Sequence, residues 1–289
     1  MADILPKVQD IAAPTDRRDF LKKAGAMAGL TSAGALTQLF PGRTALAQYN
    51  PKPAIATPSS YNLRSVGGVN GPNYITEVRD QGICNACTAF AVIAAMEGAI
   101  SVKANQPNPQ LHLSEEQLFS CAGPGCDTNA WYPADALAYC QNFGVANYAN
   151  YGPRDGVCHS DPSASPVRIS SYQKLADAAA MKQCISGTGT FTHASPVISL
   201  FVFYQDLWDW APHSENKVYK HKDNENNPHD EGRIGGHAVC IVGYNDSPGY
   251  WICKNSWGPG WGGVGQGYFN MSYGDCHIDD FEMYGVVAL

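Results

Sequence analysis

The sequence predicts an α+β protein in which helices occupy the first part of the chain and strands the second. Residues 88–103 are apolar on nearly every side, as in a helix buried at the centre of a domain. From about residue 166 onward, short runs of β-branched and aromatic residues alternate with turn residues, which is typical of strands. The 289 residues are 44% hydrophobic and 11% aromatic, a composition that suits one or two well-packed domains.

Two further helices are predicted in the helical part, which covers about residues 71–165. Residues 114–117, Ser-Glu-Glu-Gln, have the capping-box pattern, in which the serine and glutamine each satisfy a free backbone N–H at a helix start. A second helix should therefore begin there. Residues 133–143 form the third, because a proline suits its first turn and Gly144 is typical of the position after a helix end.

The strand-forming part is expected over about residues 166–289. Its runs are too short and too often interrupted by turn residues to be helices. Four of them have strand-like composition and predict strands at 196–203, 237–244, 250–254 and 267–271.

The first 47 residues are interpreted as an export signal of the twin-arginine type. Arg17-Arg18 stands shortly before Phe-Leu-Lys, and a mildly apolar run follows over residues 24–40. The Ala-Leu-Ala at 45–47 then forms a cleavage site. A membrane anchor is the alternative, but the run contains glycine, threonine and glutamine and is short for a span. We therefore expect export to the periplasm or the extracellular space of a bacterial-type cell.

Removal of the leader leaves a strongly acidic mature chain. Residues 1–47 carry six basic and four acidic side chains, so the remainder has a net charge of −9. No block of basic residues remains, which excludes nucleic acid and an anionic membrane surface as partners. Residues 48–60 are expected to be an extended, proline-rich tether, and residues 61–289 the folded domain. The mature form should therefore be free of the membrane.

Cys87 stands at the start of the apolar run and is the candidate nucleophile. Free backbone N–H groups and the helix dipole favour negative charge in a first helical turn, and the thiolate is the nucleophilic form of cysteine. A cysteine before an apolar helix is ordinarily structural, and Cys84 is a local rival. His237 follows two glycines at the start of a strand-like run, 150 positions downstream, and Asn255 lies 168 positions downstream of Cys87.

These features together resemble the papain-like (C1-type) cysteine peptidase family. Cysteine, histidine and asparagine follow in that order, with Gln-Gly at 81–82 upstream and Asn-Ser-Trp-Gly at 255–258 downstream. The resemblance covers about residues 61–284. It implies a two-lobed fold, in which a helical lobe packs against an antiparallel β-barrel-like lobe with the active-site cleft between them. It also implies hydrolysis of peptide bonds in a peptide or protein substrate, with no metal and no organic cofactor, and we expect a monomer.

The resemblance assigns a role to each motif residue. Cys87 would form a thioester acyl-enzyme, with His237 acting as general base and then as general acid. Asn255 would orient the imidazole, although an asparagine here could also simply end a strand. Gln81 and the backbone N–H of Cys87 would stabilise the oxyanion, the alternative for Gln81 being a solvated loop residue. Trp257 would shield the His–Asn pair from water or, alternatively, belong only to the core.

The substrate-binding wall departs from the family pattern. Where the family commonly has Cys-Asn-Gly-Gly, this chain has Cys-Asp-Thr-Asn-Ala-Trp at 126–131, which predicts a narrower or reshaped subsite. The candidate substrate-binding residues near this wall and near the histidine are Ala130, Trp131, Gly236 and Trp257.

Two further positions bear on specificity. Thr88 replaces a tryptophan of the family pattern and removes bulk beside the nucleophile. Asp279 and Asp280 fall near the pocket for the second substrate residue before the cut, where either carboxylate would favour a basic side chain. A small shift of the alignment would place Phe281 there instead.

All ten cysteines lie after the leader, which suits an oxidising compartment. The resemblance implies two disulfides, Cys84–Cys126 and Cys121–Cys158. The pairing of the other cysteines apart from Cys87 stays open: Cys140, Cys184, Cys240, Cys253 and Cys276. The third bridge of the family would use Cys276, but residues 217–233 contain no partner for it.

Cys240 and Cys253 lie in strand-like runs and are interpreted either as buried thiols or as a cross-strand pair. A zinc site is not expected, because no Cys-x-x-Cys pair recurs at the spacing of metal ligands.

Two other functions would use the same residues. A catalytically impaired, peptide-binding module on the peptidase scaffold would account for the altered wall, and an acyl-transferring transpeptidase would resolve the thioester with an amine. The intact Gln81, Cys87, His237 and Asn255 favour a peptidase over a binding module.

Overall fold

The computed structural model describes residues 56–126, 131–152, 155–159, 165–208, 210, 217–221, 233–262 and 265–289. The expected export signal at 1–47, most of the tether at 48–60 and the candidate Ala130 lie outside these residues. In the part that is described, no helix has both the length and the apolar character needed to cross a membrane.

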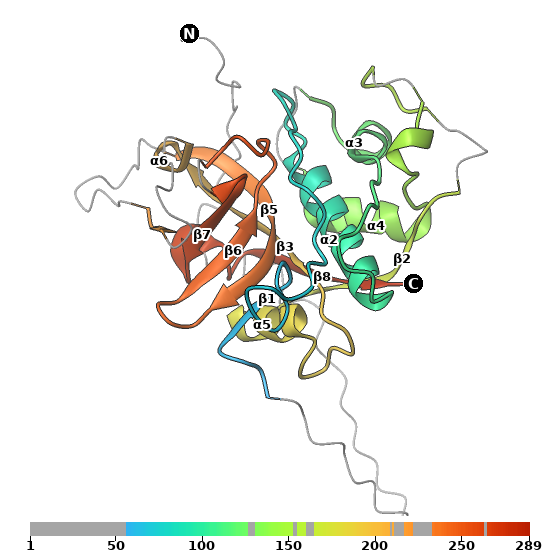
Figure 1. Cartoon of the computed structure of the whole chain (residues 1–289). Helices are drawn as coiled ribbons and strands as arrows, with labels where there is room; N and C mark the ends of the chain where they lie inside the picture. Colours follow the sequence, from blue (N-terminus) through green and yellow to red (C-terminus); the bar gives the residue numbers. More distant parts are fainter. Residues whose placement is uncertain are drawn as a thin grey trace, which may run out of the picture.

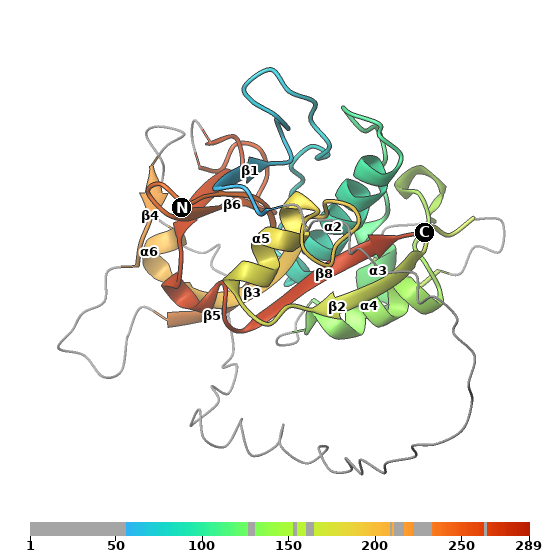
Figure 2. The same cartoon turned by 90° about the horizontal axis from the view of Figure 1, so that it is seen from below.

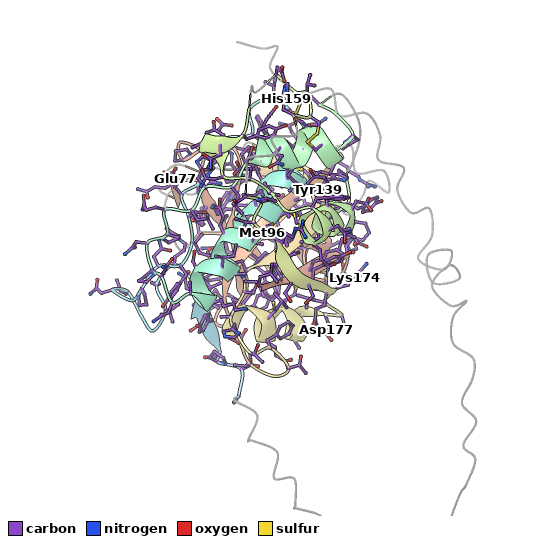
Figure 3. The ribbon with its side chains drawn as sticks, turned by 90° about the vertical axis from the view of Figure 1, so that its right-hand side faces the viewer. Glu77, Met96, Tyr139, His159, Lys174 and Asp177 are labelled. Carbon is purple, nitrogen blue, oxygen red and sulfur yellow. A yellow bond between two sulfur atoms is a disulfide. The ribbon has the colours of Figure 1, made fainter. Side chains whose placement is uncertain are left out.

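The predicted central helix is confirmed as α2 (Cys87–Lys103). Its side chains are buried around nearly the whole circumference, with Val92, Ile93 and Met96 fully shielded from solvent. Figure 1 shows α2 between the strands on one side and the helices α3 and α4 on the other. In Figure 3, seen from the helical side, Met96 marks the middle of this helix. The all-round apolar sequence therefore reflects a helix enclosed by the rest of the protein.

Two shorter helices, α3 (Glu115–Ala122) and α4 (Pro133–Asn142), pack on α2. The Ser114 hydroxyl accepts a hydrogen bond from the backbone N–H of Gln117 at 3.0 Å, which is one half of the predicted capping box. The other half is replaced, because the Gln117 side chain instead accepts from the backbone N–H of Ala146 at 2.6 Å. The helix cap thus also anchors a distant loop.

All the strands in the described part of the chain belong to one sheet. Along the sheet they follow the order β2 (Ile169–Lys174), β8 (Glu282–Ala288), β3 (Val197–Tyr204), β5 (Arg233–Asn245), β6 (Tyr250–Lys254), β7 (Tyr268–Ser272) and β4 (Val218–Tyr219). The short β1 (Ser60–Asn62) pairs with β5 outside this path. Every pairing is antiparallel except that of β4 with β7. The four predicted strands correspond to β3, β5, β6 and β7.

The α+β class is confirmed, but the sheet is not closed into the barrel-like lobe that was expected. At its two ends, β2 pairs only with β8 and β4 only with β7. Figures 1 and 2 show that β8 continues beyond its pairing with β3 and, together with β2, lies beside α2 and α4. The sheet therefore extends under the helices instead of curling on itself.

Several elements were not predicted. The helix α5 (Ala178–Ser186) covers part of the sheet, begins at an Asp177 cap and ends at Gly187, whose φ of 66° suits glycine. A short helix α6 (Gln205–Trp208) follows β3 directly, and two 3₁₀ turns, η1 (Tyr148–Asn150) and η3 (Asp275–His277), lie in loops.

The cysteines divide into two disulfides and a set of free thiols. The disulfides are Cys84–Cys126 and Cys121–Cys158, the pairs that the family resemblance implies. The other cysteines are unpaired, and all of them except Cys87 are buried: Cys140, Cys184, Cys240, Cys253 and Cys276. Cys240 and Cys253 are therefore separate thiols, and no cross-strand bridge joins them.

Candidate active site

Cys87 is the first residue of α2 and carries a free, partly exposed thiol. Ala86 precedes the helix and offers no capping side chain, so the first-turn N–H groups are not satisfied by a cap. The Cys84–Cys126 disulfide holds the loop that leads into the helix. The backbone of Ala238 on β5 acts to lower the pKa of the Cys87 thiol, against the larger effect of burial. Ala238 directly follows His237 in the chain.

His237 and Asn255 are joined directly. The Nε2 atom of His237 lies 2.7 Å from Oδ1 of Asn255, which follows the end of β6. The same oxygen accepts the backbone N–H of Ser256 at 2.9 Å, and the Asn255 N–H donates to the carbonyl of Gly267. Asn255 is thus held by hydrogen bonds of both its side chain and its backbone, so it does more than form a turn. The Nδ1 atom of the His237 imidazole is left for another partner.

An aromatic shell encloses this pair. The Trp257 ring stacks on the His237 ring, with centroids 4.6 Å apart and planes inclined by 25°. Phe203 lies against both rings, and Trp208 of α6 covers Trp257 at 4.9 Å. The histidine is consequently only 4% exposed. The Trp257 ring thus covers one face of the imidazole that contacts Asn255.

Burial works against charge on both reactive groups. It raises the pKa of the Cys87 thiol, although hydrogen bonds from the backbone of Ala238 and Thr88 act in the opposite direction. It also lowers the pKa of His237 to about 4, partly offset by the hydrogen bond to Asn255. Each group alone thus favours its neutral form. A thiolate–imidazolium pair depends on the attraction between the two new charges.

Gln81 is held between the two halves of the molecule. Its Nε2 donates to the carbonyl of Cys84 at 2.8 Å, and its Oε1 accepts from the Ser256 hydroxyl at 2.6 Å. The backbone N–H of Gln81 also donates to the carbonyl of Ser256 at 2.8 Å. The glutamine, which is partly exposed, is therefore held in place through both its side chain and its backbone. One of its two amide hydrogens remains for a further acceptor near Cys87.

Ser256 is the functional residue that the sequence analysis did not single out. It contacts the glutamine through its hydroxyl and carbonyl and the asparagine through its N–H, and it is 5% exposed. The sequence signal was its place inside the Asn-Ser-Trp-Gly motif at 255–258.

The residues expected to form the substrate wall are only partly brought to the site. Trp131 is buried, packs edge-on against Phe119, and its carbonyl accepts the Thr88 hydroxyl at 2.6 Å. Its side chain thus belongs to the core rather than to an open wall. Thr88, which replaces a bulkier residue, is itself buried and has this structural partner. Gly236 lies on β5 next to His237 and is partly exposed.

Asp279 has a structural role as well. Its Oδ2 accepts the indole N–H of Trp251 and the backbone N–H of Gly274, each at 3.0 Å, and the residue is 8% exposed. A carboxylate engaged inside the protein does not present itself to a substrate side chain. Asp279 therefore gives no support to the expected preference for a basic residue. Asp280, the neighbouring candidate, is exposed and lies 3.0 Å from Nδ1 of His277. Phe281, the other candidate for this place, is partly buried against the core.

Within the described parts of the chain, no three histidine, cysteine, aspartate or glutamate side chains gather so as to hold a metal ion. The arrangement instead unites a thiol at a helix start, an oriented imidazole and a fixed amide donor from three distant segments. This set can perform nucleophilic acyl chemistry.

Comparison with known proteins agrees with this geometry. The family described as "Papain family cysteine protease" matches residues 57–286, most of the chain. The chain belongs to the papain family. Among papain-family relatives, Peptidase 1 of Dermatophagoides pteronyssinus is 34% identical over 212 residues, which are 72% of this chain and 61% of that protein. Pro-cathepsin H of Bos taurus is 30% identical over 228 residues, 75% of this chain and 60% of the relative.

Solved structures show the papain-like fold. Digestive procathepsin L 3 of Tenebrio molitor larval midgut superimposes with a TM-score of 0.60 at 26% identity, covering 81% of this chain and 71% of that one. The Amb a 11 cysteine protease of ragweed pollen, in its proform, gives a TM-score of 0.62 at 22% identity, covering 82% and 68%. This chain spans about three fifths of the length of the curated relatives that it matches.

Proposed function

We propose that the protein is an exported cysteine peptidase that hydrolyses peptide bonds through a Cys87 thioester. The observation that carries the proposal is the 2.7 Å contact between His237 and Asn255, covered by the stacked Trp257 ring, together with a free cysteine at the start of α2. A solvated histidine or an isolated thiol would not need this arrangement. Membership of the papain family supports the same chemistry.

In the proposed mechanism, His237 takes the Sγ proton of Cys87 while the sulfur attacks the substrate carbonyl carbon. The carbonyl oxygen becomes an oxyanion that accepts hydrogen bonds from the Cys87 backbone N–H and the remaining Gln81 amide hydrogen. His237 then gives its proton to the leaving amine as the C–N bond breaks, which leaves a thioester. A water molecule, deprotonated by His237, attacks the thioester, and the released thiol recovers its proton.

The proposal includes export and a substrate cleft. Residues 1–47 act as a twin-arginine-type signal and residues 48–60 as a tether, and residues 61–289 form the peptidase domain. Its helical lobe covers about residues 71–165 and its β lobe about residues 166–289. The mature protein is a monomer in the periplasm or outside the cell, where its two disulfides persist. Peptides or proteins bind across Gly236 and Trp257, and neither nucleic acid nor membrane is a partner.

The catalytic proposal is tested with fluorogenic peptides and mass spectrometry of the products. The wild-type protein should cleave peptides, while Cys87→Ser and His237→Ala should lose the activity and still bind the same peptides. Binding without cleavage by the wild type would favour the peptide-binding module. Ligated products, formed when an amine acceptor is added, would favour acyl transfer over hydrolysis.

Export is tested separately by fusing residues 1–47 to a reporter that is active only after export in folded form. The wild-type leader should export it, and the double substitution Arg17→Lys and Arg18→Lys should retain it inside the cell. Equal export of both fusions would contradict a twin-arginine route.

A further inference from the structure

The short helix α6 carries a tryptophan against the candidate site. Trp208 is its last residue, and the centroid of its ring lies 4.9 Å from that of Trp257, which stacks on His237. Trp208 also lies against Phe203 and is 36% exposed, so it is the outer layer of the aromatic cover. A helix of four residues is not stable by itself in water. Other contacts must therefore hold Trp208 in this place.

One such contact is made by Asp206, on the same helix. Its Oδ1 accepts the hydroxyl of Tyr219 at 2.7 Å and lies 3.0 Å from Nδ1 of His221. Because an ionised carboxylate oxygen only accepts hydrogen bonds, His221 donates from Nδ1. Tyr219 belongs to β4 and His221 follows this strand, which lies beside α6 (Figure 2). We call Asp206, Tyr219 and His221 the α6 clamp.

The histidine of the clamp is itself fixed by two further contacts. Its ring stacks on that of Tyr204, the last residue of β3, with centroids 3.7 Å apart and planes inclined by 14°. The backbone N–H of His221 donates to Oδ2 of Asp275 at 2.8 Å, and the His221 side chain is 8% exposed. The donor that Asp206 meets therefore has a set position, and the clamp joins α6 to the sheet and to the η3 turn.

Apolar contacts place the same segment on the sheet but do not set its rotation. Leu207 is buried, and Trp210 packs edge-on against Tyr219, with centroids 5.8 Å apart. Such contacts have little directional preference, whereas hydrogen bonds depend on angle. Asp206 and Trp208 are two positions apart and therefore lie on nearly opposite sides of the helix. By fixing one side, the clamp fixes the direction of the other.

We propose that Asp206 is a positioning residue of the active site, which holds α6 so that Trp208 covers Trp257 beside His237. The role rests on the proposed function, in which His237 is the general base. Asp206 acts through the two tryptophans and not by contact with the imidazole. Loss of its hydrogen bonds frees α6 to turn, which lets water approach the rings around His237.

The consequence for the imidazole follows from its burial. Burial lowers the pKa of His237 to about 4, below its ordinary value of 6.5. Water near the ring stabilises the imidazolium, so a loosened cover raises this pKa. The clamp thus helps to keep His237 in the neutral form that can take the Cys87 proton.

The test is an NMR titration of His237 in the Cys87→Ser protein, where no thiol titrates beside the imidazole. Asp206→Leu keeps the bulk but removes the acceptor, and it should raise the His237 pKa by about one unit. Asp206→Asn keeps an acceptor oxygen and should change this pKa by less than about 0.3 unit. Trp208→Ala should match Asp206→Leu, and the two changes combined should add nothing, because both act on the same cover.

Asp177→Leu is the matched control for a loss of stability alone. Asp177 accepts the Ala180 N–H at 2.8 Å and caps α5, which Figure 1 shows well away from α6. This variant should lower the denaturation midpoint and leave the His237 pKa unchanged. If Asp206→Leu does not fold, Tyr219→Phe removes only one donor of the clamp and should give a smaller rise.

An unchanged His237 pKa in Trp208→Ala, or in the clamp variant that folds, would overturn the proposal. An equal rise in Asp206→Asn and Asp206→Leu would overturn it as well, because the acceptor would then have no part in the effect. The titration needs no peptidase activity. Its failure therefore leaves the proposed function standing, and a protein that cleaves no peptide can still show the expected rise.

Discussion

Replacing Asn255 with alanine should weaken the coupling between His237 and the Cys87 thiol. The Asn255 oxygen lies 2.7 Å from Nε2 of a histidine that is 4% exposed, so bulk water is kept from this bond. A hydrogen bond to a charged group contributes about 1.5–3 kcal/mol, or about one to two pKa units. Asn255 raises the pKa of His237 against the burial that lowers it to about 4. The variant should therefore form the imidazolium about 10- to 100-fold less readily.

The assay is the rate of Cys87 alkylation by iodoacetamide between about pH 4 and pH 9, a range that spans the ordinary pKa values of histidine and cysteine. The wild type should react well below the ordinary cysteine pKa of about 8.5, and Asn255→Ala should lose this acid-side reactivity. Asn270→Ala, at a buried asparagine on β7 away from the site, is the matched control for lost packing. Rates for Asn255→Ala within about twofold of wild type across this range would refute the reasoning.

Three further outcomes are expected. Thr88→Val keeps the shape but leaves the buried Trp131 carbonyl without its 2.6 Å partner, so urea denaturation should show a loss of about 1–3 kcal/mol; an unchanged midpoint would disprove this. In the Cys87→Ser variant, burial holds the pKa of His237 at about 4, below its ordinary value of 6.5. Between these two pH values, the unfolded chain therefore binds more protons than the folded protein does. The stability from neutral His237 is then full above pH 6.5 and should decrease by up to about 3 kcal/mol as the pH falls to 4; a flat profile in pH-dependent denaturation would argue against it. Finally, Ellman titration of the native protein should show one fast thiol, Cys87, and six after denaturation, because the other five free thiols are buried; several fast native thiols would contradict the fold.

The parts of the fold that the sequence predicted well depend on neighbouring residues. The apolar run predicted α2 almost to the residue, since a helix enclosed on all sides needs apolar side chains at every position. Ser114 predicted the start of α3 because its hydroxyl reaches an N–H only three residues away. The partner of the Gln117 side chain was not predictable in this way. It bonds to Ala146, whose position is set by the packing of a separate loop.

The unpredicted elements are those whose residues give no clear local signal. The strand β8 carries Glu282 and Gly285 among its apolar residues, and β2 is largely polar. Both form strands because they pair with each other and because β8 pairs with β3. The same pairing carries the sheet under the helices, which is why it does not close into a barrel.

The candidate site shows the same division between local and long-range information. The motifs identified Cys87, His237, Asn255 and Gln81, because the chemistry needs these side chains whatever surrounds them. Burial then decided what each could do. It turned Trp131 and Asp279 into structural residues, and it made charge unfavourable on the thiol and the imidazole alike.

By itself, the sequence indicated the family and predicted the candidate reactive groups and the local elements that carry Cys87 and His237. These properties follow from residue identity and from hydrogen bonds within a few positions of the chain. Only the tertiary structure decided the orientation of the Asn255 amide, the stacking of Trp257 on His237 and the hydrogen bond between Gln81 and Ser256. Each of these joins residues more than a helix apart in the chain, and their distances and desolvation exist only once the helices and the sheet have packed together.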